Sequence, residues 1–109
     1  MSYNETLAQR MRAELIGLSG ISEKKMFGGI GFLLHGNMAC GVHGDEMIVR
    51  VGPQRHAEAL AHEHARPFDM TGRPMAGWVM VSMDGLQAEA DFREWLRWGV
   101  DFAASLPPK

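Results

Sequence analysis

Three glycines beside a lysine pair form the segment whose residue types most readily suggest chemistry. Gly28, Gly29 and Gly31 follow Lys24-Lys25, and backbone amides exposed beside lysines can hold an anion such as phosphate. Phosphate loops, however, connect a strand to a helix, whereas residues 32–34 here are apolar and continue a strand. We therefore expect the glycines to let a helix pack closely over Gly29 and Gly31, with phosphate binding as the alternative.

Two arginines are candidates for recognising an anion. Arg50 lies within an apolar strand pattern, and Arg73 lies in a loop bounded by Gly72 and Pro74. Pairing with a carboxylate such as Asp69 would anchor this loop to the sheet. We predict a structural salt bridge of this kind, with an anionic ligand or partner as the alternative.

The histidines and the single cysteine do not form a metal-binding motif. His62 and His64 are two residues apart, so on a helix they would diverge by roughly 200° and could not bind one ion. Cys40 is the only cysteine, which excludes an internal disulfide and a multi-cysteine zinc site. We expect Cys40 to be a small buried hydrophobe and the protein to hold no metal and no cofactor.

Trp98 is the candidate residue for contact with another protein. It falls about 90° from the centre of the apolar stripe of the final predicted helix, at the boundary of that stripe. A bulky aromatic side chain in this position suits a contact with another subunit or protein.

Composition and motifs exclude several classes of function. No Ser-His-Asp or Cys-His set is evident, so we predict no catalytic residues, although a small enzyme assembled from distant residues stays an alternative. Eleven Lys and Arg against thirteen Asp and Glu give a net charge of −2 without a long basic run, which argues against direct nucleic-acid binding. No apolar stretch reaches the roughly 20 residues of a membrane helix. The N-terminus lacks a secretory signal, so we expect a cytoplasmic protein.

The first half of the chain predicts one helix and three strands. Ser2-x-x-Glu5 fits a capping box and opens a helix that carries an apolar stripe. The pattern then favours strands over 26–34, 38–43 and 47–51, joined as an antiparallel meander. The apolar stripe of the first helix consists of Leu7, Met11, Leu15 and Leu18.

The second half predicts two helices and two strands. Pro53 opens a helix with an apolar side that reaches His64, and Phe68 with Met70 suggests a short strand. Residues 78–81 form a further strand, and Asp84 caps the long final helix. The stripe of that helix consists of Ala88, Phe92, Trp95, Leu96, Gly99, Phe102 and Ala103. The order α-β-β-β-α-β-β-α over residues 1–109 predicts a single α+β domain with helices packed against a largely antiparallel sheet.

Four segments along the chain form a recognisable pattern when taken in order. They are Met26-Phe27-Gly28-Gly29-x-Gly31, Gly36-x-Met38, Ile48-Val49-Arg50-Val51, and Phe68-Asp69-Met70-Thr71-Gly72-Arg73-Pro74-Met75-x-Gly77-Trp78. Together they resemble the N-terminal domain of the TfoX/Sxy proteins, which are regulators associated with bacterial competence. The resemblance implies a small α+β module of the bacterial cytoplasm with a role in transcriptional regulation and no established catalytic residues. Full-length regulators also carry a helical C-terminal domain, which we expect to be absent here.

Together these observations favour a non-enzymatic regulatory or adaptor module that acts through protein contacts, either with a partner protein or by self-association. The alternative is a small anionic-ligand-binding domain or small enzyme with a pocket between the 26–34 strand and the 71–78 loop. The residues predicted to form the ligand or partner surface are Gly28, Gly29, Gly31, Arg50, Arg73 and Trp98.

Overall fold

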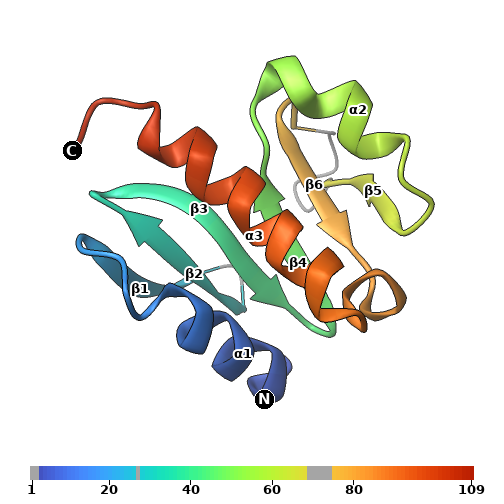
Figure 1. Ribbon diagram of the computed structural model, residues 1–109, viewed down its shortest axis with the longest axis horizontal. Coiled ribbons are helices and arrows are strands. Elements are labelled where there is room, and N and C mark those ends of the chain that lie inside the picture. Colours follow the sequence, from blue (N-terminus) through green and yellow to red (C-terminus); the bar gives the residue numbers. More distant parts are fainter. Residues whose placement is uncertain (1–2, 27, 69–74) are drawn as a thin grey trace.

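The computed structural model describes residues 3–26, 28–68 and 75–109 and confirms the α+β fold. In this part of the chain, three α-helices pack against a six-stranded antiparallel sheet of order β1-β2-β3-β4-β6-β5 (Figure 1). The strands are β1 Ile21–Met26, β2 Gly29–Leu34, β3 Asn37–His43, β4 Glu46–Arg50, β5 Ala65–Pro67 and β6 Trp78–Val81. The helices are α1 Glu5–Leu15, α2 His56–Leu60 and α3 Glu89–Ala104, with 3₁₀ turns η1 Pro53–Arg55 and η2 Met83–Leu86.

The predicted first helix is present as α1, but it is shorter than expected. Asn4 is its N-cap, and the Asn4 side chain accepts a hydrogen bond of 3.0 Å from the backbone N–H of Leu7. The predicted capping residue Ser2 lies outside the described residues. Because the helix ends at Leu15, Leu18 does not continue the buried stripe and is 42% exposed.

Strand β1 was not predicted from the sequence. Its central residues are polar, because it lies at the edge of the sheet and pairs only with β2. Lysines are common on such edges, where they discourage pairing with other chains. The predicted 26–34 strand is therefore two strands: Met26 ends β1, and β2 begins at Gly29.

The glycines allow a close approach different from the one predicted. A side chain at Gly29 would collide with the carbonyl oxygen of Val42 in the adjacent strand β3, and not with a helix. The close contact between helix and sheet occurs instead at Gly99 of α3, where a Cβ would collide with the carbonyl oxygen of Ala39. The prediction of a helix packed on Gly29 was therefore wrong, since the neighbouring strand occupies that space.

The elements of the second half differ from the predictions mainly in their bounds. The helix opened by Pro53 ends at Leu60 and does not reach His64. Phe68 follows β5 directly, whereas Met70 lies outside the described residues. Strand β6 has the predicted bounds. Asp84 lies in η2, so it does not cap α3, whose N-cap is Ala88 without a side-chain hydrogen bond.

The main hydrophobic core lies between the helices and one face of the sheet. Its largest fully buried side chains include Phe32 of β2 and Phe92 of α3. A smaller cluster of Ile48, Met80 and Phe68 occupies the other face. None of the helices in the described part of the chain is both long and apolar enough to cross a membrane.

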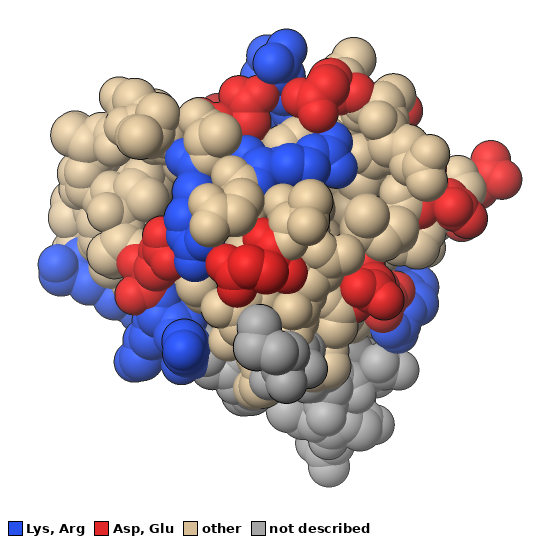
Figure 2. Space-filling model, turned by 90° about the horizontal axis from the view of Figure 1, so that it is seen from below, with Lys and Arg blue, Asp and Glu red and all other residues tan. Residues whose placement is uncertain are grey.

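Ion pairs connect α1 to β1 and to the start of α3. Arg12 donates hydrogen bonds to Glu23 of β1 at 2.8 Å and to Glu5 at 3.0 Å. Arg10 donates to Glu89 of α3 at 2.9 Å. Figure 2 views the molecule from the side on which α1 lies and shows basic and acidic side chains interleaved there. We call this set the arginine seam; it comprises Arg10, Arg12, Arg93, Glu5, Glu14, Glu23 and Glu89.

Candidate binding groove between α2 and α3

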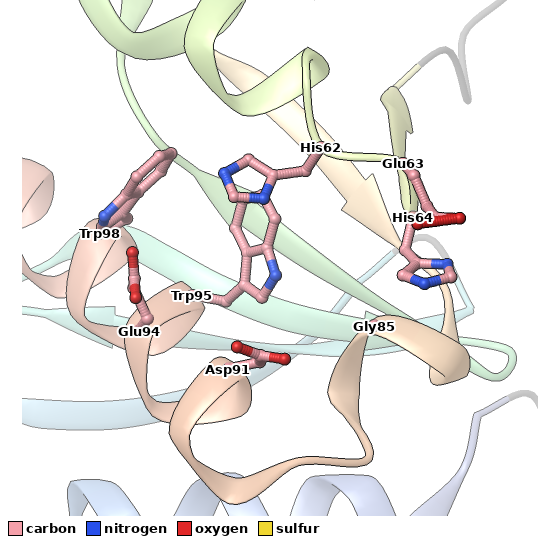
Figure 3. A pocket seen from close by; sticks show the side chains of 8 residues that line it. All are labelled: His62, Glu63, His64, Gly85, Asp91, Glu94, Trp95 and Trp98. Atoms are coloured by element: carbon pink, nitrogen blue, oxygen red, sulfur yellow. The ribbon is translucent and has the colours of Figure 1, made fainter.

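Two adjoining hollows lie along α3, the first beside residues 62–64, which follow α2, and the second beside residues 51–55, which precede α2. The first hollow has a volume of about 180 Å³, and its lining residues are labelled in Figure 3. The second is lined by Pro53, Arg55 and Phe102 among others. Trp98 lines both hollows, so they meet at its side chain. We call the two hollows together the α2–α3 groove.

One face of α3 forms a complete wall of this groove. Asp91, Glu94, Trp98, Asp101 and Ser105 follow one another at intervals of three or four residues, which places them on one side of the helix. This side carries three carboxylates around a tryptophan. Because Phe92, Trp95 and Leu96 anchor the helix in the core, the positions of these groove residues are set by the fold.

Three aromatic rings meet at the centre of the groove. The His62 ring lies 5.0 Å from Trp95 and 5.8 Å from Trp98, and the two tryptophan rings are 5.3 Å apart, all in edge-to-face arrangements. Trp95 is only 7% exposed and belongs to the core, whereas Trp98 is partly buried. The guanidinium of Arg55 lies 5.2 Å from the Trp98 ring centroid, at a distance typical of cation–π contacts.

The carboxylates of the first hollow are unpaired within the described chain. Glu63, Asp91 and Glu94 form no ion pair or side-chain hydrogen bond with any described residue, and no lysine or arginine of the described chain lines this hollow. In Figure 3, Asp91 and Glu94 project from α3 beside the rings of Trp95 and Trp98, and Glu63 and His64 lie across the hollow. The hollow is thus acidic with an aromatic wall.

The two histidines occupy different positions from those predicted. Because α2 ends at Leu60, His62 and His64 follow a turn and both line the first hollow. The expectation that they diverge on a helix was wrong. Even so, no three histidine, cysteine or acidic side chains gather as a possible metal site in residues 3–26, 28–68 and 75–109.

A comparison with protein families matches residues 13–103 to the TfoX N-terminal domain. This chain belongs to the TfoX N-terminal domain family. No curated protein and no solved structure gives a match. The family assignment confirms the resemblance seen in the sequence.

The structure describes four of the other predicted site residues of this TfoX-family domain, and these four are distributed over two different strands and the turn before one of them. Gly28, with φ of 74°, lies between β1 and β2, while Gly29 and Gly31 lie within β2. Arg50 lies at the end of β4, and two strands, β3 and β4, separate β2 from β6. Arg73 lies outside the described residues.

Arg50 contacts aromatic rings. Its guanidinium is 5.1 Å from the Trp78 ring centroid and 5.2 Å from that of Phe102. These contacts give Arg50 a packing role between strand β6 and helix α3. The predicted partner Asp69 lies outside the described residues, so the predicted salt bridge stays a prediction.

Cys40 is buried, as predicted from its apolar neighbours. Complete burial raises the pKa of the Cys40 thiol to about 12. Because the thiolate is the reactive form, this thiol is a poor nucleophile at neutral pH.

In this family member, Trp98 is the one predicted surface residue that lines the groove, and its contact role stays a prediction; the other groove residues were not predicted. The spacing of Asp91, Glu94, Trp98 and Asp101 could have shown that one side of α3 is acidic. The opposite wall, which includes His62, depends on where α2 ends, and the sequence around His62 does not predict that position. Only the fold brings the two walls together.

Proposed function

We propose that this TfoX-family domain is a non-enzymatic adaptor or regulatory module of the bacterial cytoplasm and that the α2–α3 groove is its protein-contact surface. The observation that supports the proposal most is the position of Trp98, which is partly buried between two hollows. Partly exposed tryptophan surrounded by packed neighbours is typical of residues that dominate protein interfaces.

The shape of the groove favours a chain segment as occupant. A compact metabolite would be enclosed by a single deep cavity, with most of its surface buried. Here two open hollows lie one after the other along α3, joined at Trp98. An extended or helical segment of a partner could contact both at once.

A second apolar surface competes with the groove. Ile16 is 86% exposed, and Leu18 is also exposed near the C-terminal end of α1. Leu18 lines a hollow with Arg93 and Val100 of α3, on the side of this helix that faces away from the groove. Single exposed apolar side chains are common on monomeric proteins, so this surface is the weaker candidate.

Site-specific photocross-linking in living bacteria would test the proposal. A photoreactive amino acid at Asp101 reports on the groove, and the same amino acid at Arg93, which lies about 140° around the helix from Trp98, reports on the hollow beside Leu18 as a matched control. We expect a cross-linked partner from position 101 that is lost when Trp98→Ala is added, and none from position 93. Cross-links from position 93 alone, or cross-links unaffected by Trp98→Ala, would contradict the proposal.

A further inference from the structure

We infer that the occupant of the α2–α3 groove is a basic segment of a partner protein, with an arginine or lysine side chain in the first hollow. This inference rests on the proposed function and specifies the chemistry of the partner. It is drawn from the size of the hollow, its charge and its aromatic wall.

The first hollow has room for one long side chain. Its volume of about 180 Å³ is below the roughly 300–1,000 Å³ of pockets that enclose whole small ligands. The hollow continues at Trp98 into the second one, where the flanking residues of the same segment could lie. A side chain inserted from an extended segment fits this geometry.

The charge of the first hollow selects a cation. Glu63, Asp91 and Glu94 carry three negative charges, and no described residue pairs with them. A guanidinium or ammonium group inserted here would satisfy these carboxylates through charge-assisted hydrogen bonds. An acidic segment would meet three like charges, which disfavours it as an occupant.

The aromatic wall adds an interaction that only a cation gains. The rings of Trp95 and Trp98 line the hollow, and tryptophan is the side chain that attracts cations most strongly through its ring face. Arg55 already lies 5.2 Å from the Trp98 ring centroid, so a guanidinium is accommodated on this residue within the chain itself. Arginine also suits carboxylates because its planar fork donates two parallel hydrogen bonds.

An NMR titration of the whole ¹⁵N-labelled chain would test the inference. The probe is the peptide acetyl-Gly-Arg-Gly-amide, and the same peptide with Gln or Glu in the centre serves as the neutral or acidic control. The indole N–H signals of Trp95 and Trp98 report on the groove, and that of Trp78 reports on the sheet. We expect a saturable shift of the first two signals with the arginine peptide only.

Conservative variants make the titration specific to the groove carboxylates. Asp91→Asn and Glu94→Gln should each weaken binding of the arginine peptide about fivefold or more, as expected for the loss of a charge pair. Glu58→Gln removes the same charge from an exposed position of α2 outside both hollows, and it should leave the affinity unchanged. Equal shifts with the Gln peptide, an absence of shifts, or an affinity that neither groove variant alters would overturn the inference.

The two sets of experiments distinguish a failure of this inference from a failure of the proposed function. If the cross-link from position 101 depends on Trp98 while the arginine peptide does not bind, the groove is a contact surface for a partner of other chemistry. If sedimentation shows a dimer that Trp98→Ala dissociates, the occupant is a second copy, and the inference of a basic partner is overturned. If the cross-link is independent of Trp98, the proposed function itself fails.

Discussion

The two sides of α3 carry similar charged residues in different surroundings. On the side facing α1, Glu89 and Arg93 belong to the arginine seam, where each carboxylate meets an arginine. On the side facing α2, Asp91 and Glu94 line the groove and meet no cation in the described chain. The comparison shows that neighbouring residues on one helix can hold the fold together or remain available to a partner, depending on the element that faces them.

The charged residues on the two sides of α3 also differ in how much they contribute to the stability of the fold. Partly exposed ion pairs contribute roughly 0.2–1 kcal/mol each, so the seam orients α1 more than it stabilises the domain. The groove carboxylates are exposed to solvent, so leaving them unpaired costs the folded state little free energy. Their neutralisation should therefore affect binding without affecting folding.

The largest expected effect separates the two tryptophans of the groove. Trp95→Ala should lower the free energy of unfolding by about 3–5 kcal/mol, because it removes a core side chain that is 7% exposed. Trp98→Ala should cost much less, because Trp98 is only partly buried. Urea unfolding of the monomeric proteins measures both values. Equal losses would mean that Trp98 is a core residue and not a contact residue.

A smaller effect is expected in the arginine seam. Arg12→Met removes two ion pairs but keeps an aliphatic side chain, so it should lower the free energy of unfolding by about 1 kcal/mol. Arg97→Met is the matched control, since Arg97 forms no ion pair with any described residue, and it should change stability by less than about 0.5 kcal/mol. The Arg12 effect should shrink in high salt. If the loss of stability in Arg12→Met does not depend on salt, it comes from the packing of the Arg12 side chain and not from its ion pairs.

A still smaller effect concerns acid stability. The hydrogen bond from Arg12 lowers the pKa of Glu5 below its ordinary value of 4.5. A lowered pKa in the folded state stabilises the protein above pH 4.5 and ceases to do so as the pH falls through the lowered value. Glu5→Gln should therefore reduce the loss of melting temperature on acidification below about pH 4.5, compared with Glu58→Gln. Identical acid profiles for the two variants would contradict the role of this pair.

Much of the fold could be predicted because apolar periodicity and turn residues determine local structure. The stripe of α1 and strand β6 are examples, since each buries a regular set of side chains. Strand β1 could not be predicted in this way, because an edge strand buries little and Ser22, Glu23 and Lys24 lack an apolar pattern.

The site was less predictable because it depends on contacts between distant segments. Trp98 was predicted at the boundary of the apolar stripe, and its partial burial agrees with that position. The pairing of Trp98 with His62 depends on the turn after Leu60, and residues 61–64 contain no glycine or proline that would predict this turn. Gly29 illustrates a different error. It was predicted to pack against a helix, whereas the backbone of the adjacent strand β3 occupies the space beside it.

The most direct test of the difference between the two sides of α3 is the stability of the double variant Asp91→Asn with Glu94→Gln. If these carboxylates serve a partner and not the fold, the free energy of unfolding should fall by less than about 1 kcal/mol, because the lost charge of Asp91 in the first turn of α3 is partly offset by the removal of two like charges from neighbouring turns. Equilibrium urea unfolding measures this value. A loss of more than about 1 kcal/mol would show that the groove carboxylates support the fold as the seam does, and it would contradict the account.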